Sequence, residues 1–431
     1  MIEFIIKFKY WNTELQANRE KIKILNNINF WFVVLKIKVP GIFILRKIYW
    51  ILSLFRRNLD RKTICILHIG TAKAGSTSIQ RYMKSNRKAL ARQGILYPDF
   101  NRPFGQKGNH KSLAYYAAGN DWVVDKKFNT HSKSKKLGWN KADWNKAFEK
   151  YLGSALHQGE NTIKTVVFSS EQLHIRLTEA RHVQKLKSLL SRFFDEIKIV
   201  VYLKPQSTLA VSNFSQQLKS DRQIIDFFEG RIYSDTFYDY LNMLDIWSQV
   251  IGQDNVLIRL MDNSDESIKD VVKDLVTIIN ADASQLKDLE SNRNISYDSI
   301  SIDLLILLNI YFSRGKKYEL KRSIVKYLRK ASSSGKKKLP GKKEVKAFDE
   351  RYFEKNRKIA RKYLNREQLF VVNYDKYPEK ATSFSLKTDL NNKLDGLNDY
   401  LTGNSGLKDS SLNNWKEIYI KVQNKIQKLK V

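Results

Sequence analysis

The chain has 431 residues, of which 42% are hydrophobic, so it can bury a core as one large domain with extensions or as two ordinary domains. Lysine and arginine total 77 against 44 aspartates and glutamates, and this net charge of +33 predicts an anionic partner: phosphate groups, nucleic acid, an acidic glycan or a membrane surface. The single cysteine, Cys65, excludes an intramolecular disulfide and a thiolate zinc site.

Residues 1–60 form a basic, aromatic segment that we expect to be helical. Cations, a proline and a glycine interrupt its apolar stretch 30–55, so no run reaches the roughly 20 residues that a spanning helix needs. Two interpretations stay open: the segment lies in a membrane interface, or it packs on the domain as a helical hairpin. We expect no signal peptide, because the start lacks a small-residue cleavage site after a long apolar core. The expected location is cytoplasmic, at the inner face of the cell membrane under the first interpretation.

The centre of the chain alternates strand-like and helix-like segments. Short apolar runs rich in β-branched residues occur at 63–69, 164–170, 196–203 and 255–261, as is typical of strands buried on both faces. Helix-like stretches between them include 76–94, closed by Gly94, and 209–221. This alternation predicts the α/β class, as a three-layer, P-loop-like domain with a central parallel sheet and helical N- and C-terminal extensions.

We place this domain at 61–380. Residues 99–140 are predicted to be a long loop insertion that contacts the substrate. From about 300 the chain is helical and basic, with a flexible basic loop at 331–343. Residues 381–431 are predicted to be a polar tail that ends in an amphipathic helix.

A glycine-bracketed loop, GTAKAGSTS at 70–78, follows the first predicted strand. The glycine spacing matches a Walker A loop, but Ser76 stands where an NTPase carries lysine, and the lysine lies inside the loop as Lys73. Loop N–H groups and the N-terminus of the following helix still favour a phosphate oxyanion. The changed lysine position places the charge beside the bridging oxygen of a 5′-phosphoanhydride.

The stretch HIGTAKAGSTSIQRYM, continued by LARQGILYP, resembles the 5′-phosphosulfate loop of sulfotransferases that use 3′-phosphoadenosine 5′-phosphosulfate (PAPS). It is most similar to the bacterial branch that acts on carbohydrates. The resemblance covers about 62–262 and continues weakly through 353–365. It implies PAPS as sulfuryl donor and a donor-binding loop made of Gly70, Thr71, Ala72, Lys73, Ala74, Gly75, Ser76, Thr77 and Ser78.

The same family has a second anion site, for the 3′-phosphate of PAPS, with an arginine at a strand end and a serine eight positions later. The stretch YLKPQSTLAVSNFSQ is similar to it, and the resemblance implies that Lys204 and Ser212 hold this phosphate. The departure is lysine for arginine: an ammonium group offers one point charge and no bidentate fork.

Residues 233–262 resemble the family's aromatic helix leading into a late strand that bears an arginine. The resemblance implies that Tyr233 faces the adenine and that Arg259 contacts donor or acceptor anions. Core packing of Tyr233 and a structural salt bridge of Arg259 are the alternatives.

Sulfuryl transfer needs a cation for the charge that develops on the leaving phosphate and a base for the acceptor hydroxyl. Lys73 is the expected cation. The candidates for the base are Glu171, at the carboxyl end of the second predicted strand, and His110, in the long loop. His68 lies on a strand and is expected in the core. No carboxylate pair is spaced like a magnesium site, so we expect no metal.

The leading hypothesis is therefore a PAPS-dependent sulfotransferase that modifies hydroxyls of a carbohydrate, such as a surface or capsular polysaccharide. One alternative is an NTP-dependent small-molecule kinase, against which the lysine position and the missing magnesium carboxylates count. The other is a non-enzymatic basic adaptor at a membrane. Nucleic acid is not an expected partner, because the chain carries no recognisable nucleic-acid module.

Overall fold

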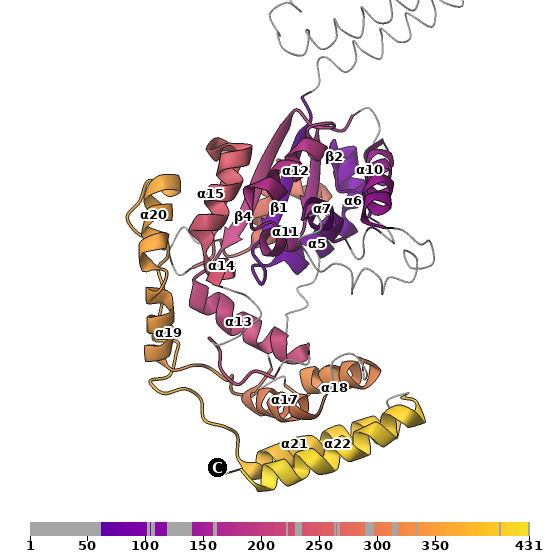
Figure 1. Ribbon diagram of the computed structural model, residues 1–431, viewed down its shortest axis with the longest axis vertical. Coiled ribbons are helices and arrows are strands. Elements are labelled where there is room, and N and C mark those ends of the chain that lie inside the picture. The colour runs from indigo at the N-terminus through magenta and orange to yellow at the C-terminus, as the bar shows by residue number, and fades with distance from the viewer. Residues whose placement is uncertain are drawn as a thin grey trace, which may run out of the picture. The chain divides into compact units, whose positions relative to one another are not determined.

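The four apolar runs predicted as strands form the sheet of the computed structural model, together with one short additional strand (Figure 1). The strands are β1 (Ile64–Gly70), β2 (Ile95–Leu96), β3 (Thr165–Ser169), β4 (Glu196–Leu203) and β5 (Val256–Leu260). Their order is β2-β3-β1-β4-β5, and every neighbouring pair is parallel. The predicted α/β class with a central parallel sheet is therefore confirmed.

The structure describes most of the chain after residue 61. The described residues are 62–100, 104, 108–118, 140–157, 162–220, 223–228, 235–262, 264, 268–288, 297–312, 318–332, 335–404 and 407–429. The predicted N-terminal segment 1–60 and Tyr233 lie outside them, as does most of the predicted loop 99–140.

Helices cover both faces of the sheet because side chains alternate between the faces along each strand. One face packs on α5 (Ser76–Ser85) and α16 (Val271–Ile278). The other face packs on a larger set. This set comprises α7 (Lys111–Ala117), α10 (Lys141–His157), α11 (Gln172–Arg176), α12 (Ala180–Leu190), α14 (Asp235–Tyr238) and α15 (Tyr240–Ile251). The three layers are those that the sequence predicts.

The predicted helix 76–94 is divided in two. The helix α5 ends at Ser85 and α6 (Arg87–Arg92) follows, with Asn86 between them. The Asn86 amide donates to Tyr82 O at 3.2 Å and to Lys287 O at 3.1 Å. The asparagine thus satisfies backbone carbonyls at the break, which a pattern of apolar residues does not reveal. Two 3₁₀ turns, η1 (Gln253–Asn255) and η2 (Ala283–Gln285), complete the domain's short elements.

A second apolar cluster lies beyond the sheet and is built by helices from the C-terminal part of the chain. They are α17 (Ser299–Tyr311), α18 (Tyr318–Lys330), α21 (Lys387–Asn404) and α22 (Asp409–Gln427). The helix α13 (Gln206–Lys219) joins this cluster through Phe214 and Leu218. Two further helices, α19 (Lys342–Glu350) and α20 (Phe353–Leu364), contact α13 and α15 respectively.

The predicted polar tail after residue 380 differs from what the structure shows. Its terminal amphipathic helix is present as α22, but α21 precedes it, and the two helices lie side by side (Figure 1). Buried residues line the inner side of both helices: Leu390, Leu394, Leu397, Leu401, Trp415, Ile418, Val422 and Ile426. Because the leucines of α21 recur every three or four residues, they form an apolar stripe that overall polarity hides.

Candidate active site

The predicted phosphate loop lies at the carboxyl edge of the sheet, between β1 and α5. Thr71 fastens it to β4, because both its backbone N and its hydroxyl donate to Tyr202 O at 3.0 Å. The backbone has positive φ at Gly70 (120°), Lys73 (63°) and Gly75 (83°). A left-handed conformation is uncommon for a residue other than glycine and recurs at ligand sites. Lys73 therefore stands at the bend of the loop.

The start of α5 adds backbone donors beside this loop. The first-turn N–H groups of a helix have no intrahelical carbonyl to bond, and here the first turn contains no acidic residue. The side chains of Thr77 and Ser78 are exposed, whereas that of Ser76 is buried and donates to Thr71 O at 3.3 Å. Gly75 is required by packing, since a Cβ there would lie 2.4 Å from Val271 Cγ2 of α16.

Lys204 and Ser212, chosen for their spacing, meet at this loop. The Lys204 side chain is 7% exposed, and its Nζ donates to Ser212 Oγ at 3.1 Å and to Lys73 O at 2.8 Å. The spacing works because β4 ends at Leu203 and Ser212 lies on the second turn of α13, facing back toward the strand end. Burying an ammonium group costs free energy unless a negative charge pairs with it, and here the partners are neutral oxygens.

A cavity of about 480 Å³ opens beside these residues. Its walls come from α13, the start of α17, the segments 337–339 and 376–377, and Lys73. Five lysines and no carboxylate line it: Lys73, Lys219, Lys337, Lys338 and Lys376. Only Lys338 forms an ion pair with a carboxylate of the described residues, at 2.6 Å from the buried Asp303. The cavity is thus strongly positive.

The pKa values of three lysines are lowered mainly by burial, and for two of them repulsion between positive charges is a second cause. Burial, aided by the charges of Lys73 and Lys376, lowers the pKa of Lys204 to about 7. Burial, aided by Lys73 and Arg329, lowers the pKa of Lys219 to about 8. Desolvation by the surrounding protein also lowers the pKa of Lys73. An anion in the cavity would relieve this repulsion, so the site is suited to a multiply charged anion.

Glu171 follows β3 and lies against the first residue of the loop, since a Cβ on Gly70 would be 3.4 Å from Glu171 Cα. Its carboxylate accepts from Gln80 Nε2 at 3.0 Å and from Asn109 Nδ2 at 3.2 Å. Asn109 is in turn held by Ser170 Oγ, which donates to its Oδ1 at 2.9 Å. A half-buried carboxylate with a fixed orientation beside the phosphate loop has the position that a general base needs.

His110 does not fit the role of a base. It is fully buried, its Nε2 lies 2.9 Å from Pro98 O, and its Nδ1 accepts from Ser169 N at 3.0 Å. Both ring nitrogens are therefore occupied by the backbone, and burial lowers the pKa of His110 to about 4. The candidate was chosen as a residue of the predicted long loop, but His110 itself packs against the end of β3. His68 lies in the core, as predicted.

Arg259 is likewise engaged in the fold rather than in the cavity. Its guanidinium forms a bidentate ion pair with Asp274 of α16, with Nε at 3.1 Å from each carboxylate oxygen. Tyr202 also donates to Asp274, at 2.8 Å, so the group ties β4 and β5 to α16. The structural salt bridge, the alternative interpretation, is the one that matches the structure.

Several cavity residues were missed by sequence reasoning: Lys219, Tyr297, Lys337, Lys376 and Tyr377. Lys337 belongs to the basic loop 331–343, which was predicted to be flexible. In the structure Leu339 N donates to Thr382 Oγ1 at 3.0 Å and Thr382 N donates back to Leu339 O at 2.9 Å. The run of lysines in the sequence was the available signal for a cationic site. The order of this loop could not be predicted, because Thr382, the partner of Leu339, lies more than 40 residues later in the chain.

The described residues contain neither a cluster suited to a metal ion nor a helix suited to spanning a membrane. Within that part of the chain, no group of three or more histidine, cysteine, aspartate or glutamate residues is placed to hold a metal ion. Nor does any helix there combine the length and apolarity that crossing a bilayer requires.

Comparisons with known proteins complete the description. No family model matches the chain, and no curated protein matches it. Among solved structures, the fold is similar to a sulfotransferase from Alicyclobacillus acidocaldarius, at 15% identity over 58% of this chain and 94% of that chain, with a TM-score of 0.33. A likeness of this extent carries no argument about activity, so function has to be argued from the site itself.

Proposed function

We propose that this protein is a sulfotransferase that moves the sulfuryl group of PAPS to a hydroxyl of a carbohydrate. The observation that carries the proposal is the meeting of Lys204, Ser212 and the Lys73 loop beside a cavity lined by lysines alone among charged residues. PAPS carries anionic groups on both its 5′ and its 3′ oxygen, and a nucleotide charged at two places needs two adjacent cationic sites.

Each part of the site has a distinct task in this proposal. The loop and the start of α5 hold the 5′-phosphosulfate, while Lys204 and Ser212 hold the 3′-phosphate. Tyr297 and Tyr377 line the same cavity and supply aromatic surface for the adenine. The prediction that Tyr233 faces the adenine stays a prediction, because Tyr233 lies outside the described residues.

The chemistry is an in-line displacement at sulfur. Glu171 takes the proton of the acceptor hydroxyl, the hydroxyl oxygen bonds to sulfur, and the bond from sulfur to the bridging phosphate oxygen breaks. Negative charge grows on that oxygen, and Lys73 stabilises it. The products are a sulfated carbohydrate and adenosine 3′,5′-bisphosphate.

The direct test is transfer itself. The full chain is incubated with PAPS labelled on sulfur and with a panel of glycans, and label in the glycan fraction supports the proposal. Retention of all label in PAPS, together with transfer of phosphate from ATP to the same glycans, would identify a kinase instead.

Replacing Lys204 by methionine tests the 3′-phosphate site. The variant keeps most of the side chain's volume but removes a charge-assisted contact worth about 1.5–3 kcal/mol, so we expect the affinity for adenosine 3′,5′-bisphosphate to fall by roughly 10- to 100-fold. ADP lacks the 3′-phosphate and serves as the internal control, with unchanged affinity. Calorimetry measures both, and an equal loss for the two nucleotides would contradict the assignment.

Binding of the bisphosphate should also depend on pH. Because the pKa of Lys204 is about 7 and that of Lys219 about 8, both lose their charge as the pH rises from 6 to 9. A bound anion favours the charged form and raises both values, so binding takes up protons and weakens as the pH rises. Calorimetry at pH 8 in buffers of different ionisation enthalpy should show this uptake; its absence would mean that the phosphates do not contact these lysines.

A further inference from the structure

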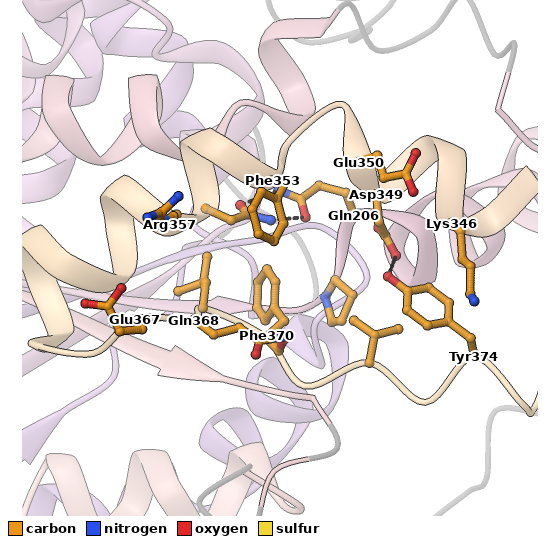
Figure 2. Close-up of a pocket in the computed structure, with 14 residues that line it drawn as sticks. Gln206, Lys346, Asp349, Glu350, Phe353, Arg357, Glu367, Gln368, Phe370 and Tyr374 are labelled. Atoms are coloured by element: carbon orange, nitrogen blue, oxygen red, sulfur yellow. Dashed lines mark hydrogen bonds between the residues drawn. The ribbon is translucent and has the colours of Figure 1, made fainter.

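A second cavity, of about 590 Å³, lies beside the turn that follows β4 (Figure 2). Pro205 and Gln206 form one part of its wall, α19 and α20 another, and the extended segment 367–374 the third. Gln206 is two residues from Lys204, and two residues of chain span at most about 7 Å. The cavity therefore adjoins the proposed donor site but does not include it.

Aromatic rings line this cavity from opposite walls. Phe353 is the first residue of α20 and is 57% exposed, and Phe370 faces it from the extended segment (Figure 2). Tyr374 stands further along the same segment. A large exposed ring beside a cavity offers apolar surface that a ligand can cover.

The polar groups of the cavity are planar and fixed in orientation. Gln206 and Asn356 exchange hydrogen bonds through their amides, at 2.9 and 3.0 Å. The Asp349 carboxylate accepts from Ser207 N at 2.9 Å. It also accepts from the Tyr374 hydroxyl, at 3.2 Å (Figure 2). Amides in fixed positions can both donate to and accept from hydroxyl groups, and carboxylates can accept from them.

The lining of this cavity differs in charge from that of the lysine-lined cavity beside Lys73. Its lining contains three carboxyl groups and only two cations: Asp349, Glu350, Glu367, Lys346 and Arg357. In a chain of net charge +33, a wall with more acids than bases is a local exception. Because Arg361 also pairs with Glu367 at 2.5 Å, the surroundings of this cavity are close to neutral, and they offer an anion none of the excess positive charge of the lysine-lined cavity beside Lys73.

We propose that this cavity binds an uncharged sugar residue of the acceptor glycan, next to the residue that is sulfated. A sugar ring has a face of C–H groups, which an aromatic ring covers, and a rim of hydroxyls, which planar polar side chains bond. Phe353 takes the face of the ring, and Glu350 and Arg357 meet the hydroxyls. Naming the ligand as the acceptor rests on the proposed function, but binding of the sugar does not need the transfer reaction.

The test is binding of uncharged hexasaccharides of glucose, galactose, mannose and N-acetylglucosamine to the full chain without donor, measured by calorimetry. At least one should bind, and Phe353→Ala should weaken that binding about tenfold because the covering ring is removed. Ile420→Ala is the matched control: Ile420 is 56% exposed and lies on α22, outside the cavity. It should bind as the unchanged protein does.

Two results would overturn the proposal: none of the four hexasaccharides binds, or Phe353→Ala binds as tightly as Ile420→Ala. Both variants change exposed side chains, and equal melting temperatures would show that both fold. Affinity for adenosine 3′,5′-bisphosphate is measured in parallel. Normal affinity for the bisphosphate with no sugar binding refutes this inference alone, whereas the reverse pattern refutes the proposed function alone.

Discussion

Replacing Lys73 by alanine should reduce the rate of sulfate transfer by about 10²- to 10³-fold, the loss typical when one group that stabilises a developing oxyanion is removed. The side chain is exposed at the bend of the loop, so its removal leaves the core intact. Alanine also adopts the positive φ no more readily than lysine does, so the loop gains no new freedom. The turnover number at saturating PAPS is the measurement.

The matched control is Lys84→Ala. Lys84 is an exposed lysine in the last turn of α5, outside the lysine-lined cavity, and its loss changes the net charge equally. If Lys73 acts on the leaving group, the two variants differ in turnover while their melting temperatures agree. Equal turnover in both variants would remove Lys73 from the mechanism.

Replacing Glu171 by glutamine should lower the turnover number by about 10²- to 10⁴-fold, because glutamine keeps the shape of the side chain but cannot accept the acceptor's proton. The amide oxygen can still accept from Gln80 or Asn109, which preserves the local structure. Affinity for adenosine 3′,5′-bisphosphate should be unchanged, since the proposed phosphate contacts lie on the loop and on Lys204. Single-turnover assays and calorimetry measure the two effects separately.

Glu179→Gln provides the comparison for this second variant. Glu179 is an exposed carboxylate that pairs with Arg181 at 2.8 Å, and it is the residue immediately before α12. It should retain full turnover. If Glu171→Gln also retains it, the proton goes to another group, and His110 is a poor choice because the backbone occupies both of its nitrogens.

The sequence determined the parts of this protein that depend on neighbours along the chain. Apolar runs bounded by polar turns identified four of the five strands, because strands buried on both faces have no polar alternation. The loop Gly70–Ser78 was recognised because its two glycines, which adopt positive φ, and the helix start that follows them can be read from the local sequence. Lys204 and Ser212 lie together, as their spacing predicted, because the end of one strand and two turns of the following helix fix the distance between them.

Tertiary structure decided what depends on contacts between distant segments. Asp274 lies on a helix 15 residues after Arg259 and neutralises it, so an arginine that sequence left open as an anion contact became a structural ion pair. Lys219, Lys337 and Lys376 come from three separate parts of the chain, and only folding brings them to the same cavity as Lys73. His110 was placed in a loop by its neighbours but buried by β3. Local patterns report backbone geometry and periodic burial, whereas the charge state and accessibility of a side chain are set by whatever the fold brings against it.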